Sequence, residues 1–477
     1  MIKYAKQKEK SVIMKRIISL ILSIVILSTL VLSVSCAQEE EVFDMDFHVD
    51  YVVDLTGVTF QWGTGWLTQF YPNEGFSLVG DNMRQHYRDI EAELGCNIEI
   101  VAWEDGGKRI MQDIAAGMKT CDIVDSHATN AGIELYKAGL LAALDDIPNF
   151  NGYDEKYGPL RFRQYGIFDG KLYGLYQYLW DFPPEFHGIM SFNVDLLSSL
   201  GVALPYEYQE NGTWTWANYK DYLMTIDNAA SSAGYGNEFI PHTAQVLTRD
   251  VFSWMFMNGC KVIEKDSNGN YFCGVNNTKG MATLDFLGEL SDLKLYEEGG
   301  TNPFIKNQTA AIMTSESYFT THFQEGNESA YLPGQPWIYG VVNYPYGPDG
   351  DENCVSGFVH KGRRLNWVVA YSGNELSDIG IFLDHLFEPI DEEGGWKSSL
   401  SYSVFHDKRD YENYLKILEN VNYNHDLSLG AAYSNLESSC VFAAQGKRTG
   451  AEAFESVKTM IDEAMKNVTW VYEDLID

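Results

Sequence analysis

Alternating strand and helix signals over residues 51–144 constrain the fold of this chain more than any other feature. The strand-like runs are 58–60, 98–101 and 121–124, and the runs with helical spacing are 79–94, 110–118 and 133–141. Repeated strand–helix–strand units predict a parallel sheet, and ligands of such sheets bind at the carboxyl ends of the strands. We therefore predict an α/β fold in which the loops after these three strands carry the site.

Those loops are rich in tryptophan and short polar side chains. By position alone, the candidate ligand contacts are Trp62, Trp66, Trp103 and Glu104, and the third loop carries Asp125, Ser126 and His127. A chain with 25 Phe, 11 Trp and 30 Tyr places most of its rings in the core, so packing is the competing interpretation for each tryptophan. The acidic candidates compete in the same way with ordinary solvated or capping charges.

The remainder of the chain predicts a second α/β lobe. Local patterns predict a hairpin turn at 169–171, a helix at 216–230 capped by Thr215, a helix at 244–258 and a strand at 365–371. A Pro183-Pro184 pair cannot lie inside a central strand, and it indicates a crossover between lobes. Small residues at 309–313 and apolar residues at 337–344 indicate that the chain returns to the first lobe. We expect lobe 1 to comprise residues 51–180 and 309–360, and lobe 2 to comprise residues 181–308 and 361–477.

The N-terminus has the three parts of an export signal. Six basic residues precede an apolar, charge-free run at 17–32, which ends in small residues before Cys36. These residues resemble the lipobox of bacterial lipoproteins, although Ser33 stands where Leu is usual. That resemblance implies a signal peptide over residues 1–36, starting at Met1 or Met14, with Cys36 acylated. An acidic tether at 37–50 would then hold the domain on the outer face of a membrane.

Net charge and cysteine content limit the possible binding partners and disulfides of the chain. The chain has 34 Lys+Arg against 67 Asp+Glu, a net charge of −33, which disfavours nucleic-acid partners. Six cysteines remain after Cys36, and an even number outside the cytoplasm permits disulfides. Only Cys260 and Cys273 have a local argument, because the turn at 266–270 would bring two short strands together. Buried free thiols are the equally weighted alternative.

Several segments together resemble the extracellular solute-binding proteins of ABC importers, in the branch of maltodextrin and multiple-sugar binders. The segments are CDIV at 121–124, YKAGLLAALD at 136–145, DGKLYGL at 169–175, FNVDLL at 192–197, TWTW at 213–216, FSW at 252–254 with NG at 258–259, and AAIM at 310–313. The resemblance implies two α/β lobes joined by crossing segments, with a carbohydrate in the cleft. It also implies a monomer that is not an enzyme, needs no cofactor or metal, and docks on permease subunits.

The resemblance to maltodextrin binders also implies roles for individual residues. Trp254 matches the tryptophan that stacks on a sugar ring from the second lobe, and Ser126 stands where those proteins carry a first-lobe aromatic. Trp180 and Asp181 lie in the first crossover, where that group places an acidic contact. The remaining contacts that it implies are Tyr178, Glu316 and Tyr318.

Two other classes of function stay open at this stage. A secreted glycoside hydrolase needs two carboxylates about 5 to 9.5 Å apart, and 67 acidic residues make such pairs easy to imagine. The sequence contains no HExxH, GxSxG, GxxxxGK[ST] or complete GxGxxG motif. A polyamine or peptide receptor on the same scaffold is the third class, since acidic and aromatic residues can cage a cation.

Overall fold

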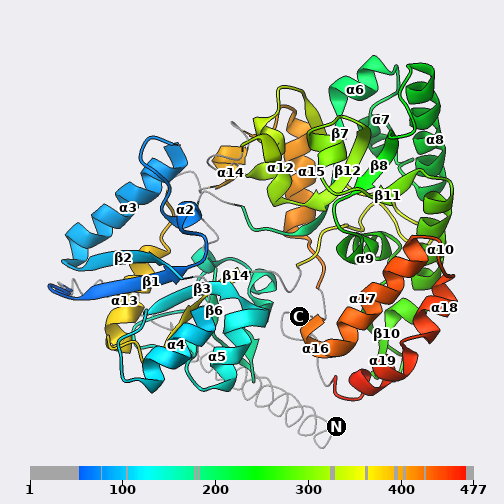
Figure 1. Cartoon of the computed structure of the whole chain (residues 1–477). Helices are drawn as coiled ribbons and strands as arrows, with labels where there is room; N and C mark the ends of the chain where they lie inside the picture. The colour runs from blue at the N-terminus through cyan, green and yellow to red at the C-terminus, as the bar shows by residue number, and fades with distance from the viewer. Residues whose placement is uncertain are drawn as a thin grey trace, which may run out of the picture. The chain divides into compact units, whose positions relative to one another are not determined.

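The alternation of strands and helices predicted for residues 51–144 is confirmed. The computed structural model describes residues 53–76, 78–103, 106–176, 180, 183–322, 328–359, 364–390, 396–400, 404–423 and 426–468. Residues 55–477 form one compact unit (Figure 1). The predicted signal, tether and acylated cysteine lie outside the described residues, as do three candidate contacts: Glu104, Tyr178 and Asp181.

Lobe 1 is built on a five-stranded sheet of order β2-β1-β3-β14-β6. Its strands are β1 (Thr59–Thr64), β2 (Asn97–Ala102), β3 (Ile123–His127), β6 (Gly174–Leu175) and β14 (Arg364–Val368). Strand β1 pairs in parallel with β2 and β3, whereas β14 runs antiparallel to β3. The accompanying helices are α2 (Leu67–Phe70), α3 (Leu78–Leu94), α4 (Gly106–Ala115), α5 (Ile133–Lys137) and α13 (Leu376–Leu386). The parallel βαβ arrangement predicted for residues 51–144 is confirmed.

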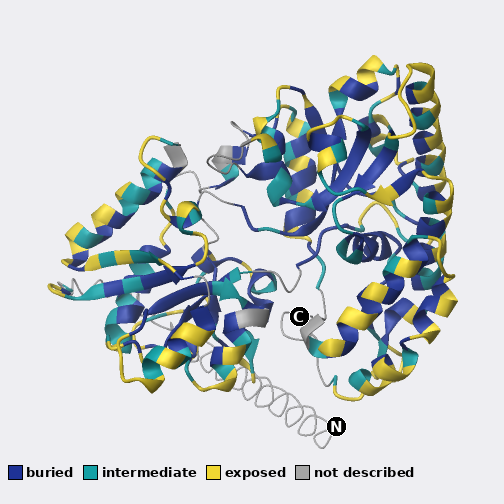
Figure 2. Ribbon diagram, viewed as in Figure 1, coloured by how far each residue is buried: buried dark blue, intermediate teal, exposed yellow. Residues whose placement is uncertain are grey.

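Lobe 2 is built on a second five-stranded sheet, of order β11-β8-β12-β7-β13. Its strands are β7 (His187–Asn193), β8 (Ile240–Ala244), β11 (Tyr296–Glu298), β12 (Ala310–Glu316) and β13 (Tyr339–Val342). Strand β12 is parallel to β8 and antiparallel to β7. Figure 2 shows the central strands of this sheet in the buried colour, with exposed residues on the outer faces of the helices.

Helices cover the second sheet and extend beyond it. They are α6 (Val194–Ser199), α7 (Pro205–Glu210), α8 (Trp216–Ser232), α9 (Leu247–Met257), α10 (Thr278–Asp292), α11 (Asn302–Ile305), α12 (Tyr318–Thr321), α15 (Lys408–Glu419), α16 (Asp426–Leu429), α17 (Ala431–Ala444), α18 (Gly450–Glu455) and α19 (Lys458–Met465). Thr215 caps α8 as predicted, since its side chain accepts a hydrogen bond from the backbone N–H of Asn218. A further short helix, α14 (Trp396–Ser399), begins at Trp396. The backbone N–H of Trp396 donates a hydrogen bond to the carbonyl oxygen of Trp180 at 2.8 Å.

The predicted division of the later segments between the lobes is wrong. Strands β12 and β13, expected in lobe 1, belong to the lobe 2 sheet, and β14, expected in lobe 2, belongs to the lobe 1 sheet. Helix α13 also belongs with lobe 1, because Phe382 stacks on Phe60 of β1 with ring centroids 4.2 Å apart. A run of small apolar residues indicates a buried strand, but it carries no information about which of two sheets the strand joins.

Two predicted hairpins are confirmed. Strands β4 (Ile167–Phe168) and β5 (Lys171–Leu172) pair antiparallel across Asp169 and Gly170, which both have positive φ, as a tight hairpin turn requires. Strands β9 (Ile263–Lys265) and β10 (Tyr271–Cys273) pair across the 266–270 turn. The six described cysteines are free thiols, and Cys260 and Cys273 are both buried.

None of the helices in the described part of the chain is long and apolar enough to span a membrane.

Candidate functional site

The carboxyl ends of β1 and β3 bring polar side chains together on one face of the lobe 1 sheet. Thr64 ends β1 and lies opposite Asp125 of β3 in the parallel register, and Asn366 of β14 lies opposite Asp125 on the other side. Directly opposed residues of neighbouring strands share a face. Arg364 begins β14 two residues before Asn366, so its side chain shares that face too.

These side chains form a connected network. The hydroxyl of Thr64 donates to Oδ2 of Asp125 at 2.8 Å and accepts from Nη2 of Arg364 at 3.1 Å. Arg364 and Asp125 form an ion pair, and the side chains are 16% and 1% exposed. Burial lowers the pKa of Arg364 to about 9, so the guanidinium is still charged at neutral pH. Asp125 and Arg364 thus pair in surroundings that water hardly screens.

Trp66 places an aromatic ring beside this ion pair. Its backbone N–H donates to the Thr64 hydroxyl at 3.0 Å, which fixes the loop after β1 to the network. The guanidinium carbon of Arg364 lies 5.3 Å from the centroid of the Trp66 ring, a cation–π distance. The Trp66 side chain is nevertheless 51% exposed, so it keeps surface for another molecule.

A second polar cluster lies at strand ends of the lobe 2 sheet. Glu316 ends β12 and accepts hydrogen bonds from Arg249 in the first turn of α9 and from Nε2 of Gln245 at 3.3 Å. Nε2 of His187, at the start of β7, lies 3.2 Å from Oε1 of Glu316. The hydroxyl of Tyr318 also bonds to Glu316, and burial first and the Glu316 charge second raise the pKa of Tyr318. Two predicted contacts, Glu316 and Tyr318, thus meet here.

Trp62 and Trp180 pack inside lobe 1. Both are almost fully buried, and their rings meet edge to face with centroids 5.9 Å apart. Nε1 of Trp62 donates to Oδ1 of Asn366 at 3.1 Å, and the ring of Phe387 lies against Trp180 at 5.8 Å. Their roles as ligand contacts stay predictions, and their burial favours a packing role.

Trp103 and Ser126 point to the opposite face of the same sheet from Asp125. The Trp103 ring packs so closely on Gly63 that a Cβ there would lie 2.9 Å from it, and Arg109 covers the ring at 4.4 Å. Ser126 follows Asp125 in the strand and therefore alternates to the other face. Its carbonyl accepts from Nε1 of Trp367 at 3.1 Å. A position at the end of a strand does not tell which face of the sheet a residue occupies. For that reason Trp103 and Ser126 lie on a different face from Asp125.

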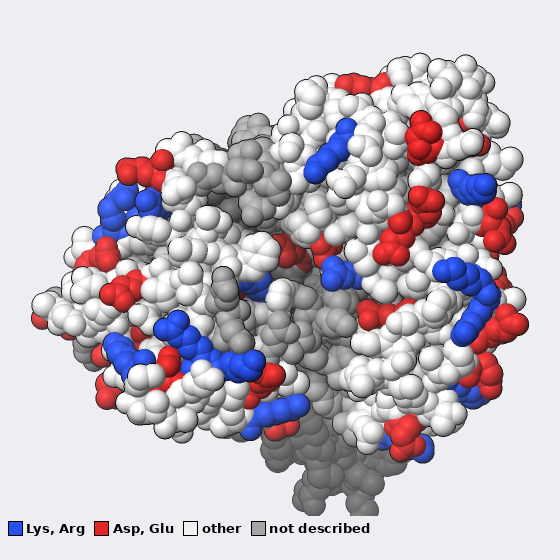
Figure 3. Space-filling model, in the orientation of Figure 1, with Lys and Arg blue, Asp and Glu red and all other residues white. Residues whose placement is uncertain are grey.

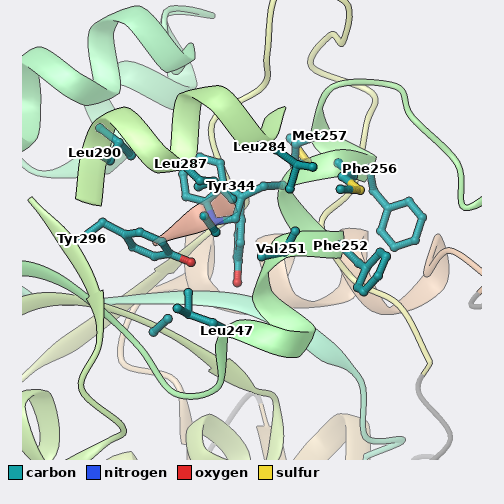
Figure 4. Packing of buried hydrophobic residues seen from close by; sticks show 14 of the residues in the cluster. Leu247, Val251, Phe252, Phe256, Met257, Leu284, Leu287, Leu290, Tyr296 and Tyr344 are labelled. Carbon is teal, nitrogen blue, oxygen red and sulfur yellow. The ribbon is translucent and has the colours of Figure 1, made fainter. Parts of the chain in front are cut away.

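Trp254 lies in the hydrophobic core of lobe 2. It is fully buried, and Nε1 donates to Oδ2 of Asp250 at 3.0 Å. The hydroxyls of Tyr296 and Tyr344 also donate to Asp250, and Figure 4 shows both rings turned into the core. A sugar would reach Trp254 only if this core opened, so its stacking role stays a prediction that packing does not favour.

Several residues that build these clusters were not predicted as contacts: Thr64, Asn366, Arg364, His187, Arg249 and Gln245, with Asp125 noted only as a polar residue of the third loop. Arg364 stands directly before the predicted strand at 365–371, and its position beside Asp125 follows only once β14 is known to run antiparallel to β3. Arg249 and Gln245 both fall within the helix predicted at 244–258, whereas in the structure Gln245 lies between β8 and α9. Strand β8 was not predicted, so nothing in the sequence placed these two side chains near the end of β12.

Charge over the visible surface is mixed. Figure 3 shows acidic and basic side chains interspersed on the face displayed, with no broad basic patch. Within the described residues, no group of three or more His, Cys, Asp or Glu side chains is arranged to hold a metal ion.

Comparison with known proteins supports the fold alone. No known family profile matches the chain, and no curated protein does. Solved structures match along most of it. The cyclic α-maltosyl-1,6-maltose binding protein of Arthrobacter globiformis matches with a TM-score of 0.62 at 13% identity, over 86% of this chain and 100% of that one.

Two further solved structures match a similar share of this chain. The GacH receptor of Streptomyces glaucescens, solved unliganded and with acarbose, gives a TM-score of 0.59 at 13% identity, over 87% of this chain and 99% of that one. The sugar-binding protein MalE of Xanthomonas citri gives a TM-score of 0.58 at 13% identity, over 87% of this chain and 99% of that one. The chain therefore has the two-lobed fold of these binding proteins, which confirms the predicted fold class.

Proposed function

We propose that this protein is a cell-surface solute-binding lipoprotein that captures a sugar or oligosaccharide and delivers it to an ABC importer. The observation that carries the proposal is the exposed Trp66 ring beside the Asp125–Arg364 pair. A pyranose has an apolar face, which suits stacking on an indole, and a rim of hydroxyls that needs donors and acceptors. Buried hydroxyls left unpaired cost about 1 to 3 kcal/mol each, so such a polar rim gives selectivity.

The ion pairs favour a sugar over a polyamine or a cationic peptide. A cation is best held by carboxylates that have no other partner, but Asp125 is paired with Arg364, and Glu316 with Arg249. Each described strand-end cluster therefore offers a donor and an acceptor side by side. That arrangement suits hydroxyls, which both donate and accept.

The same pairs disfavour glycoside hydrolysis at these two clusters. A general acid must carry a proton, whereas a guanidinium beside a carboxylate stabilises its ionised form. The fold itself is shared with proteins described as binding proteins. We propose that the protein performs no chemistry on its ligand, and a preparation that released reducing ends from oligosaccharides would contradict this.

A screen of ligands by thermal shift tests the binding function. Residues 55–477 form their own compact unit, so the chain from residue 37 onward is suited to the assay. Monosaccharides, maltodextrins, polyamines and short peptides are compared, because a ligand that binds only the folded state raises stability by mass action. We expect the largest shift with a sugar, and the largest shift with a polyamine or peptide would overturn the proposal.

Capture is proposed to involve closure of the two lobes around the ligand. Each lobe carries one cluster, and closure requires that the ligand bind the closed state better than the open one. Small-angle X-ray scattering with and without the best ligand of the screen should show a smaller radius of gyration when the ligand is bound. An unchanged radius would contradict closure, with sugar binding itself left intact.

Anchoring through Cys36 is the remaining part of the proposal. Two or more acyl chains are enough for stable attachment to a membrane, whereas a single chain gives only marginal binding. The Cys36→Ala variant is expected to leave the membrane fraction and appear in the medium or remain as an uncleaved precursor. Cys354→Ala is a matched control, since Cys354 is a free thiol within the folded unit. A Cys36→Ala protein with normal processing and full membrane attachment would overturn the anchor.

A further inference from the structure

We propose that the Asp125–Arg364 pair selects ligands by charge, so that the site accepts neutral sugars and rejects sugars that carry a carboxylate or an ammonium group. The inference rests on the proposed function, and it concerns residues to which neither position nor resemblance had assigned a role together. Its basis is the geometry of the network at the ends of β1, β3 and β14.

The pair is held in place from several directions. Asp125 accepts from the Thr64 hydroxyl and from Arg364, and Arg364 in turn donates to Thr64. The ring of Phe70 lies 5.9 Å from the Arg364 guanidinium. Since both side chains are mostly buried, separating the charges or adding a third would cost more free energy than at the surface.

A hydroxyl group suits this pair better than a charged group does. Carboxylates only accept hydrogen bonds and guanidinium groups only donate, whereas a hydroxyl does both. One hydroxyl, or two neighbouring ones, can therefore bridge Asp125 and Arg364 without breaking the ion pair. Nη1 of Arg364 is buried and has no hydrogen-bond partner, so a donor remains for this purpose.

Charged sugars meet one repelling partner whichever sign they carry. A uronate would approach Arg364 favourably, but its carboxylate would also lie beside Asp125. An amino sugar would meet the opposite problem, because its ammonium group would lie beside Arg364. Juxtaposed like charges cost free energy and give specificity against the wrong ligand.

The second lobe repeats the pattern independently. Glu316 pairs with Arg249, and the side chains are 15% and 30% exposed. Each of the two described clusters thus contains one paired carboxylate and one paired guanidinium. A site for an anionic ligand would contain a guanidinium that no carboxylate pairs with, and a site for a cationic ligand would contain a carboxylate that no guanidinium pairs with.

Two single variants and their combination test the inference. Asp125→Asn removes the counter-ion of Arg364, and Arg364→Met removes the counter-ion of Asp125. The probes are two matched sets, each with a neutral, an acidic and an amino member: glucose, glucuronate and glucosamine, and then maltotriose, trigalacturonate and the chitosan trimer. Affinities are measured by isothermal titration, together with the melting temperature of each variant.

The expected result is a change of preference with opposite sign in the two variants. Wild type should prefer the neutral member of whichever set it binds. Asp125→Asn should raise the affinity for the acidic member relative to the neutral one by about tenfold, and Arg364→Met should do the same for the amino member. The double variant should return to the neutral preference with weaker binding, since the two changes are coupled.

Matched controls separate charge selection from general damage. Arg409 and Asp407 form an ion pair at 2.7 Å near the start of α15 and belong to neither cluster, so Arg409→Met and Asp407→Asn should leave the preference unchanged. If Arg364→Met does not fold, Arg364→Lys keeps the charge without the planar fork, and it should retain the neutral preference at lower affinity.

The outcomes distinguish this inference from the proposed function. Sugar binding with equal losses for all three members of a set in both variants would overturn charge selection while the proposed function stands. A wild-type preference for the acidic or amino member would overturn it as well. Absence of binding to both sets, with a polyamine or peptide bound instead, would overturn the proposed function and this inference together.

Discussion

Two tryptophan–carboxylate pairs, one in each lobe, look alike in composition and differ in the exposure of the ring and in the partners of the carboxylate. In lobe 1, Trp66 is half exposed and its neighbour Asp125 is paired with a guanidinium. In lobe 2, Trp254 is fully buried and Asp250 is surrounded by the hydroxyls and ring N–H of neutral donors. Burial raises the pKa of Asp250, while its hydrogen bonds oppose that shift.

The difference follows from the position of each pair in the fold. Asp125 and Trp66 lie where parallel strands end, and there the Trp66 ring remains exposed while the Asp125 carboxylate is buried in its ion pair. Trp254 lies in the middle of α9, which packs between the sheet and other helices, and its carboxylate partner is one helical turn earlier. A tryptophan beside an acid therefore indicates a ligand site only when the surrounding elements leave it open.

The largest expected effect is the loss of stability on removing the buried ring. Trp254→Ala should lower the free energy of unfolding by about 3 to 5 kcal/mol, because the cavity cannot collapse fully and Asp250 loses a donor. Urea denaturation followed by circular dichroism measures this. Trp66→Ala is the control and should change stability by less than about 0.5 kcal/mol. A stable Trp254→Ala protein that had lost its sugar affinity would restore Trp254 to the ligand site.

A buried carboxylate with a raised pKa should also make stability depend on pH. Burial raises the pKa of Asp410 from 3.8 to about 7, and its Oδ1 accepts from the hydroxyl of Tyr206 and from the backbone N–H of Val341. The folded state thus holds the proton more tightly than the unfolded state. The stabilising effect of that proton is complete below about pH 4 and is lost as the pH rises to about 7.

Asp410→Asn tests this because Asn is isosteric and keeps the accepting oxygen. The variant should gain about 1 to 4 kcal/mol relative to wild type between pH 4.5 and pH 8, measured as the difference in urea unfolding free energies. Asp407→Asn is the control of opposite sign, because its hydrogen bond with Arg409 lowers the pKa of Asp407. Parallel pH profiles for wild type and Asp410→Asn would contradict the prediction.

Local sequence patterns predicted the elements of the fold well. Helical spacing at 79–94 predicted α3, the cap at Thr215 predicted the start of α8, and the positive-φ turn at 169–170 predicted a hairpin. Each of these depends on neighbouring residues. The lobe assignment of β12 and β14 failed, because pairing with β7 and β3 joins segments more than one hundred residues apart and no local pattern encodes it.

The candidate site was predictable only in outline. Parallel strands pointed to the loop that carries Trp66 and to the strand end that carries Asp125, and the role of both in binding stays a prediction. The partner Arg364 comes from an antiparallel strand about 240 residues later, so spacing in the sequence gives no sign of it. Trp62 and Trp103 show the other limit: strand alternation and helix packing decide which face and depth a ring occupies, and both depend on the tertiary fold.

Trp66→Ala should weaken binding without affecting the fold. The loss of one half-exposed stacking ring is expected to cost about 1 to 3 kcal/mol of affinity for the best sugar of the screen. Isothermal titration measures the affinity, and an unchanged melting temperature confirms that the protein is intact. Trp66→Tyr keeps an aromatic face and should retain most of the affinity, whereas equal affinities for wild type and Trp66→Ala would remove this ring from the site.

The smallest expected effect belongs to Thr64, which joins the two halves of the lobe 1 cluster. Its hydroxyl donates once, to Asp125, and accepts twice, from Arg364 and from the backbone N–H of Trp66. Thr64→Val removes all three bonds at similar volume, so ligand affinity should fall by about 0.5 to 1.5 kcal/mol as Trp66 and the ion pair lose their common anchor. Thr64→Ser keeps the hydroxyl and should restore binding, which a role in packing alone would not explain. If Thr64→Val bound sugar as tightly as wild type, Trp66 and Asp125 would have to act independently, and the contrast with the Asp250 cluster would then depend on exposure alone.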